Sequence, residues 1–180
     1  MQPQTHAGDS KVSVEHGHGL HLQKSIIIDR PAAELYAFWR NFANLPSIMT
    51  HLKSVQVTDQ RRSHWVVTAP ANTQVEWDAE VINDVPNERI GWRSLDNAQV
   101  DNAGSVVFTE LPGDRGTKID VTLQYDPPAG KAGAAIAKLF GEAPDQQITE
   151  DLRHFKQLFE TGVPTTTEGQ PSGRTKSKQS

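Results

Sequence analysis

The sequence predicts a single α+β domain in which a curved antiparallel sheet wraps around one long C-terminal helix. From about His51 to Tyr125 the apolar side chains recur with a period of two, which is the period of a pleated strand. Short turns separate these segments, and this favours antiparallel hairpins because a parallel crossover needs a dozen or more residues. An amphipathic helix is then predicted from about Pro144 to Thr161, ending at Gly162.

The chain of 180 residues is long enough for one sizeable core and short for two ordinary domains. Large apolar side chains are concentrated in residues 20–162, where we expect the folded domain. Residues 1–19 and 163–180 hold almost none. We expect both ends to be disordered tails, because such segments cannot bury enough surface to offset the entropy lost on ordering.

Composition excludes several classes of function. The chain has no cysteine, so disulfides, thiolate metal sites and cysteine nucleophiles are excluded. A net charge of -4 does not supply the broad positive field that nucleic-acid binding uses, so we expect no nucleic-acid partner. No stretch has the length of a membrane-spanning helix, and the N-terminus lacks the layout of a secretion signal. We therefore expect a soluble, cytoplasmic protein without stable membrane insertion.

The first elements are predicted from local side-chain patterns. A strand is expected from about Leu20 to Asp29, where three consecutive isoleucines favour extended backbone. Pro31 suits the first turn of a helix, and the Asp29 carboxylate should lie near the positive end of that helix. A second short helical piece is expected from Leu45 to Met49. The first helix should continue to Phe42, because an apolar stripe at helical spacing includes Leu35, Phe38, Trp39 and Phe42.

Six further strands are predicted between turn-forming residues: Leu52–Thr58, Ser63–Thr68, Gln74–Asp84, Arg89–Leu95, Gly104–Glu110 and Lys118–Tyr125. In the third of these, Glu76, Asp78 and Glu80 share one face. Three carboxylates on one face could serve metal binding or acid–base chemistry. We expect instead a solvated sheet face, with Lys and Arg of neighbouring strands pairing with these acids.

The leading functional hypothesis is an aromatic cavity between the sheet and the C-terminal helix, which suits a flat or fatty ligand. The residues predicted to line it are Trp65, Trp77, Ala79, Trp92, Phe108 and Tyr125 from the strands, with Leu152, Phe155 and Phe159 from the helix. The alternative is that these side chains simply fill the core. Residues 132–141 are rich in Ala and Gly, with Lys138, Leu139 and Phe140 as their bulky part, and we expect them to form a lid.

A catalytic version of this cavity would need acids, bases or hydrogen-bond donors aimed at the ligand. Glu110 shares a strand face with Phe108, and Tyr125 could present its hydroxyl near the cavity mouth. The alternative for both is a residue at the end of a strand that reaches water. His64 and Arg93 each alternate with a tryptophan, so we expect them to face outward.

The segment from His16 to His21 contains three histidines that could chelate a divalent metal: His16, His18 and His21. The intervening glycines indicate flexibility, and we expect neither a physiological metal site nor a cofactor. The sequence also has no Gly-rich phosphate loop and no nucleophile elbow.

Several runs carry a resemblance to a known family: residues 24–26, Leu35-Tyr36-Ala37-Phe38-Trp39 with Leu45-Pro46, residues 75–80, Asn87-Glu88-Arg89-Ile90-Gly91-Trp92-Arg93-Ser94, Phe140-Gly141-Glu142 and Asp151-Leu152. In these runs the chain resembles the polyketide cyclase/dehydrase branch of the START and Bet v 1-like (SRPBCC) superfamily, over roughly residues 20–162. The resemblance implies a helix-grip fold whose interior binds lipids, sterols, quinones or polyketides. It supplies no catalytic motif that transfers residue by residue.

Three functions remain open at this point. The first is a carrier or sensor that binds a small apolar molecule such as a lipid, a quinone or a polyketide-like compound. The second is a polyketide cyclase or dehydratase-type enzyme that uses the same cavity. The third is a protein-interaction module with a filled core, which would expose an apolar patch instead. The sequence leaves the oligomeric state open.

Overall fold

The computed structural model describes residues 20–68, 74–96, 98, 100–126 and 144–162. The expected tails and the expected lid at Lys138, Leu139 and Phe140 lie outside these residues. The elements follow in the order β1 (Leu20–Ile28), α1 (Ala32–Arg40), the 3-10 helix η1 (Phe42–Ser47), β2 (Leu52–Val57), β3 (Arg62–Thr68), β4 (Gln74–Val85), β5 (Arg89–Ser94), β6 (Asp101–Glu110), β7 (Thr117–Asp126) and α3 (Pro144–Thr161).

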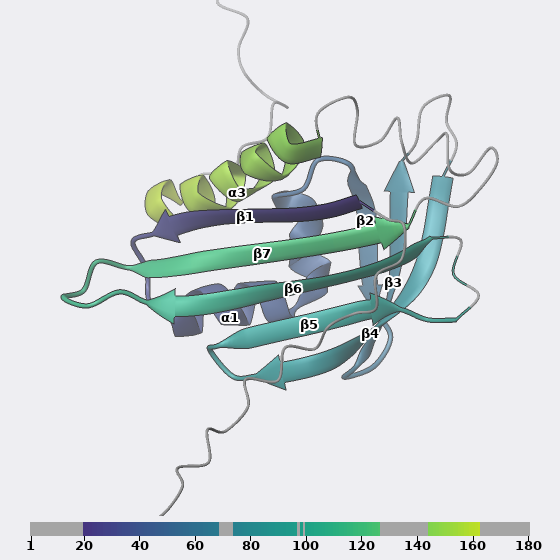
Figure 1. The fold of residues 1–180 in the computed structure, drawn as a ribbon, viewed down its shortest axis with the longest axis horizontal. Helices are drawn as coiled ribbons and strands as arrows, with labels where there is room; N and C mark the ends of the chain where they lie inside the picture. The colour runs from purple at the N-terminus through teal and green to yellow at the C-terminus, as the bar shows by residue number, and fades with distance from the viewer. Residues whose placement is uncertain (1–19, 69–73, 97, 99, 127–143, 163–180) are drawn as a thin grey trace, which may run out of the picture.

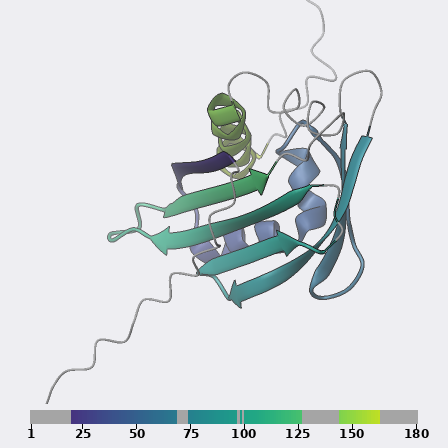
Figure 2. The ribbon, with the colours of Figure 1, turned by 45° about the vertical axis from the view of Figure 1, so that its right-hand side comes forward.

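The seven strands form one antiparallel sheet in the order β1-β7-β6-β5-β4-β3-β2, which confirms the predicted fold class. Strands β2 to β4 turn away from the direction of β1, β7 and β6, so the sheet curls around α1 and η1 (Figures 1 and 2). The register shifts between Leu52 and Ser54 and between Val81 and Asn83. Such irregularities increase the local bend and twist of a strand.

Two stretches differ from the prediction by two residues or more, the region of α1 and η1 and the start of β6, and the other bounds differ by at most one residue. The first helix ends at Arg40, and Phe42 begins η1 after the non-helical Asn41. Strand β6 begins at Asp101, although Asp101-Asn102-Ala103 has the composition of a turn. The partner strand explains the second difference, because β7 pairs with β6 across this whole stretch, as far as Asp101 opposite Asp126. Tertiary pairing has therefore overridden local turn preference.

Helix α3 lies along β1 and places its apolar side over the concave face of the sheet (Figure 1). The helix ends where expected, with Gly162 at a positive φ of 70° and its N–H bonded to the carbonyl of Leu158 at 3.0 Å. No helix in the described part of the chain is both long and apolar enough to cross a membrane.

An aromatic cluster joins α1 to α3. The ring of Phe155 lies 5.3 Å from Phe38 and 5.4 Å from Trp39, measured between ring centroids. Phe159 adds edge-to-face contacts to Phe38 and Phe155 at 5.4 and 5.2 Å. Such geometry stabilises aromatic pairs beyond the area that they bury. The cluster therefore packs the space beside α1 with side chains.

Candidate functional site

A cavity of about 100 Å³ remains between the sheet and the helices, beyond the aromatic cluster. Its wall is formed by the end of β3, the start of β4, Trp92 of β5, the facing ends of β6 and β7, and the first turns of α3. Residues of α1, η1 and the start of β2 complete it. Almost all of the lining is apolar, including Leu45, Ile48, Val67, Val121 and Leu123.

Three tryptophans make one wall of this cavity. Trp65 of β3 lies opposite Trp77 of β4, and their rings are 6.0 Å apart with 17° between the planes. Trp92 of β5 also stacks with Trp65, at 6.4 Å and 16°. Successive strands thus present nearly parallel indole rings, a surface suited to a flat apolar molecule.

Gly104 is required for the position of Trp92. The two residues lie opposite each other on β5 and β6. A Cβ atom at position 104 would come within 2.3 Å of Trp92 Cζ2 and 2.9 Å of Leu123 Cδ2. Only glycine therefore lets the indole lie flat over β6 at this place.

The titratable residues of the cavity wall are His51 and Asp151, and the amide side chains of Asn102 and Gln124 are its other polar members. Asp151 is 3% exposed, and its Oδ1 accepts a hydrogen bond from Gln147 Nε2 at 3.0 Å. Its Oδ2 lies 3.8 Å from Nδ1 of His51, whose side chain is 15% exposed. This pair brings together a residue of the turn before β2 and a residue of α3 that are 100 positions apart in the chain.

Burial changes the acidity of both groups in the direction of the neutral form. It raises the pKa of Asp151 to about 7, with Glu150 adding a smaller increase and the Gln147 hydrogen bond opposing it. Burial lowers the pKa of His51 to about 4. Between these values both side chains are neutral, so their 3.8 Å separation is not an ion pair in that range. A neutral carboxyl group beside a neutral imidazole can donate, accept or exchange a proton.

The structure brings together four of the predicted lining residues. Trp65, Trp77, Trp92 and Leu152 line the cavity. Ala79, Phe108, Phe155 and Phe159 are not among the described residues that form its wall. Phe108 packs edge-to-face on Tyr36 at 6.1 Å, and the two phenylalanines of α3 belong to the aromatic cluster. Tyr125 pairs with Leu20 and Asn102 through β7, but its side chain lies outside the described part of the structure.

Glu110, predicted as a weak catalytic candidate, is placed at the start of α1. Its Oε1 accepts a hydrogen bond from the backbone N–H of Ala32 at 3.2 Å. The N-cap residue, Pro31, makes no capping bond of its own. A carboxylate at this position satisfies an unpaired N–H group and the positive end of the helix, the place expected for Asp29. Glu110 thus positions α1 and is not part of the described cavity wall.

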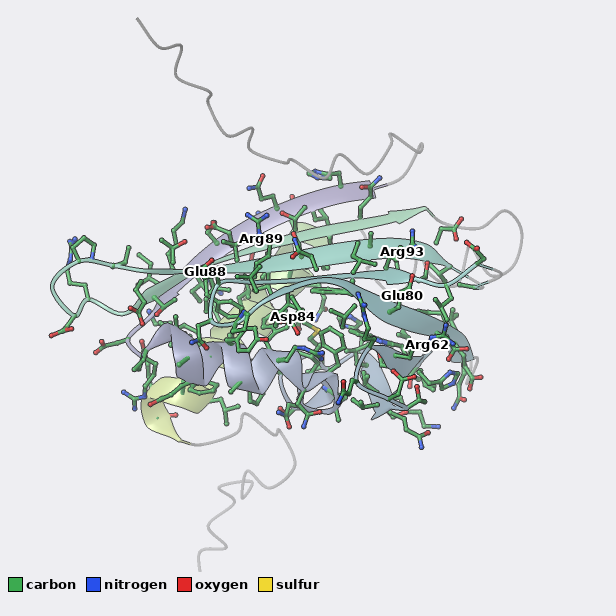
Figure 3. The ribbon with its side chains drawn as sticks, turned by 90° about the horizontal axis from the view of Figure 1, so that it is seen from below. Arg62, Glu80, Asp84, Glu88, Arg89 and Arg93 are labelled. Atoms are coloured by element: carbon green, nitrogen blue, oxygen red, sulfur yellow. The ribbon has the colours of Figure 1, made fainter. Side chains whose placement is uncertain are left out.

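The outer face of the sheet is charged, and the predicted pairing with Lys or Arg is found for Glu80, whereas Glu76 and Asp78 both lie beside His64. His64 Nδ1 lies 2.8 Å from Asp78 Oδ1, and Arg93 Nη2 lies 2.8 Å from Glu80 Oε1. Figure 3 shows Arg62, Glu80 and Arg93 near one another at one end of these strands, with Glu88 and Arg89 toward the other end. Exposed pairs of this kind add little stability.

Of the three histidines considered as possible metal ligands, the structure describes one. His16 and His18 lie outside the described residues, and His21 is an exposed residue of β1. Within the described ranges, no group of three or more His, Asp or Glu side chains is arranged to hold a metal ion.

The sequence prediction missed His51 and Asp151. A signal for Asp151 was present, because it lies at i+3 from Ile148 and one residue before Leu152, within the apolar stripe of the helix. A carboxylate inside such a stripe indicates a buried acid. No local signal marked His51, since its burial depends on a helix from the far end of the chain.

Comparisons with known proteins agree with this architecture. The profile of the family described as "Polyketide cyclase / dehydrase and lipid transport" matches residues 28–153. The chain belongs to this family, and its fold is of the START and Bet v 1-like type. By its description, the family is a ligand-binding one.

Three relatives illustrate the range. The crystal structure of DR_A0006 from Deinococcus radiodurans is 42% identical with a TM-score of 0.67, over 80% of this chain and 99% of that chain. An uncharacterized 17.2 kDa protein of Streptomyces lincolnensis is 26% identical over 141 residues, 77% of this chain and 89% of the relative. A START superfamily protein from Mycobacterium smegmatis is 15% identical with a TM-score of 0.57, over 77% and 98% of the two chains, and shows the fold alone.

Proposed function

We propose that the chain binds a small, largely apolar molecule in the tryptophan-walled cavity and acts as its carrier or sensor. The observation that carries the proposal is the cavity itself, with stacked Trp65, Trp77 and Trp92 on one side and Leu152 of α3 on the other. An apolar wall with a few polar groups is the usual composition of a small-molecule site. The family description, which includes lipid transport, supports the same function.

The size of the cavity limits what enters it. Pockets for drug-sized ligands typically measure about 300–1,000 Å³, and an apolar cavity of roughly 150 Å³ is known to hold benzene. A cavity of about 100 Å³ is smaller than either, so it limits the buried part of a ligand to about one ring, with the rest of a larger molecule outside it. The cavity also argues against an interaction module with a filled core. The exposed large apolar residues of the described chain, Ile27, Val57, Ile82 and Val85, are distributed over β1, β2 and β4.

A direct test is titration with α-methylstyrene, a neutral one-ring hydrocarbon, followed by tryptophan fluorescence and calorimetry. We expect saturable binding by the wild type and its loss in Val67→Phe, because Val67 lines the cavity and is buried. Val57→Phe is the matched control, because Val57 is 44% exposed on β2. Equal binding by both variants would contradict the cavity as the site. Native mass spectrometry of protein purified from its own host would then identify any retained ligand as a mass difference.

One observation favours a second candidate, a cyclase- or dehydratase-type enzyme. Asp151 is a buried acid in the cavity wall, and its raised pKa of about 7 is near the value at which an acid transfers protons most effectively. With a ligand recovered from the host, the two candidates differ in outcome. An enzyme would convert the ligand, and Asp151→Asn would retain binding and lose conversion. A carrier would release the ligand unchanged in both forms.

A further inference from the structure

The carboxyl group of Asp151 is a buried polar group of the cavity wall. One turn earlier on α3, Gln147 donates to Oδ1 at 3.0 Å, which fixes the orientation of the carboxyl group. Oδ2 then faces His51, at a distance of 3.8 Å from Nδ1 that exceeds a hydrogen bond. An oxygen atom placed between two atoms this far apart can lie about 2.8 Å from each of them, which is hydrogen-bond distance.

We propose that the Asp151 carboxyl donates a hydrogen bond to a carbonyl oxygen of a neutral ring-containing ligand, so that the cavity selects aromatic and cyclic ketones over hydrocarbons of the same shape. This inference rests on the proposed function, because it assigns the polar contact of a molecule that the cavity must first bind. The apolar wall alone would not distinguish such ketones from hydrocarbons of the same shape.

The surroundings favour a neutral acceptor. Asp151 is 3% exposed, and among the described cavity-lining residues it and His51 are the titratable ones. No Lys or Arg side chain belongs to that described lining, so a ligand carboxylate would be buried without a counter-charge. The indole N–H groups of Trp39 and Trp77 are further buried donors without a hydrogen-bond partner in the described structure, and both residues line the cavity. The cavity wall therefore offers buried N–H donors, beside the amide side chains of Asn102 and Gln124, and an uncharged carbonyl oxygen can accept hydrogen bonds from such donors.

Donation by Asp151 requires its protonated form. Burial raises the pKa of Asp151 to about 7, so the donor is present in mildly acidic solution and is replaced by a repelling carboxylate in alkaline solution. The titratable groups around it are His51 before β2 and, on α3, Glu150 and His154, whose Nδ1 lies 3.2 Å from the Ile48 carbonyl oxygen. Burial lowers the pKa of His51 to about 4, so His51 stays neutral throughout this range.

The test compares acetophenone with α-methylstyrene, in which a C=CH₂ group replaces the C=O group at nearly the same shape. Calorimetry gives the ratio of the two dissociation constants for the full chain at pH values of about 5.5 and 8.5, on either side of the raised pKa. Three variants are measured beside the wild type. Asp151→Leu removes the donor, Asp151→Asn keeps an N–H donor without a titrating group, and Asp145→Leu is a matched control on the exposed side of the same helix.

We expect Asp151→Leu to lower the preference for acetophenone at the acidic pH by about threefold to tenfold, the range of a neutral hydrogen bond. The wild type and Asp145→Leu should lose the same preference on going to the alkaline pH, whereas Asp151→Asn should keep it. A His154→Asn variant should retain the wild-type pH dependence. A pH dependence that disappears in that variant would assign the titration to His154 and overturn the proposal.

The outcomes separate this inference from the proposed function. If neither compound binds the wild type saturably, cavity binding itself is wrong. If both bind and their ratio is the same in the wild type, Asp151→Leu and Asp151→Asn, the cavity binds ligands but Asp151 does not select them. Should Asp151→Leu fail to fold by circular dichroism, Asp151→Asn decides, and a ratio that changes with pH as in the wild type overturns the proposal.

Discussion

Replacing Asp151 by Asn removes one buried ionisable group. The pH dependence of the free energy of unfolding should then follow the neighbouring His51, whose effect has the opposite sign. Burial raises the pKa of Asp151 from 3.8 to about 7, so the folded state binds this proton more tightly than the unfolded state does. The stabilisation from this group is complete below the unfolded pKa and is lost as the pH rises through the folded pKa. At about 1.4 kcal/mol per pKa unit, the loss from pH 4 to above 7 is about 4 kcal/mol.

His51 has the opposite sign. Burial lowers its pKa from 6.5 to about 4, so the unfolded state binds this proton more tightly. Its stabilisation is complete above the unfolded pKa and is lost as the pH falls through the folded pKa, a change of about 3 kcal/mol. In the wild type the two slopes oppose each other between about pH 4 and 6.5, and the pair contributes almost no pH dependence there.

In Asp151→Asn the His51 contribution should stand alone, and the free energy of unfolding should rise by about 1.4 kcal/mol per pH unit up to about 6.5. Urea unfolding followed by tryptophan fluorescence at a series of pH values measures the difference between variant and wild type. Groups titrating alike in both proteins, such as Asp59 and Asp84 with their lowered pKa values, cancel in that difference. Asp145→Asn, on the same helix and exposed, should track the wild type. Parallel curves for Asp151→Asn and the wild type would refute a neutral, buried Asp151.

Three further substitutions test the packing. Phe155→Ala should destabilise the fold by about 3–5 kcal/mol in urea unfolding, because Phe155 is fully buried in the aromatic cluster; a loss below about 1 kcal/mol would contradict that packing. Glu110→Ala should lower the free energy of unfolding by about 1 kcal/mol, because α1 loses its cap, and should leave the affinity for α-methylstyrene unchanged. Weaker binding by this variant would indicate that Glu110 belongs to the binding site. Gly104→Ala should cost about 1–3 kcal/mol and alter tryptophan fluorescence, because the new methyl group meets Trp92; unchanged emission would contradict the contact.

The order of the elements and their faces could be predicted from the sequence because both are local. The alternation in residues 75–81 placed Trp77 inside and Asp78 outside, and the structure shows this division in the contacts of both residues. The bounds of α3 follow from its apolar spacing and from Gly162, whose positive φ ends the helix. Signals of this kind involve residues within one or two turns or along one strand, so they need no knowledge of the tertiary packing.

The division between packed core and cavity could not be predicted in the same way. Phe155 and Trp65 are both large aromatic residues on predicted inward faces, but Phe155 meets Phe38 of α1 and Trp65 meets Trp77 and Trp92. Which of them lines a space depends on where α1 lies against α3. The sequence patterns around Phe155 and Trp65 are alike, and only the packing of the two helices decides which residue lines the cavity. The pairing of His51 with Asp151 has the same origin.

The side chains of α3 explain why the cavity lies at one end. Toward its C-terminus the helix presents Phe155 and Phe159, which reach the aromatic cluster and fill the space beside α1. Toward its N-terminus the same face presents Ile148, Asp151 and Leu152, which are smaller and leave room beneath the tryptophan wall. Because burying a polar group without a hydrogen bond costs free energy, the bond from Gln147 one turn earlier stabilises Asp151 at this position. The inward stripe of α3 thus changes along the helix from bulky aromatic residues to smaller and polar ones. This change determines both the size of the cavity and the position of its buried carboxyl group.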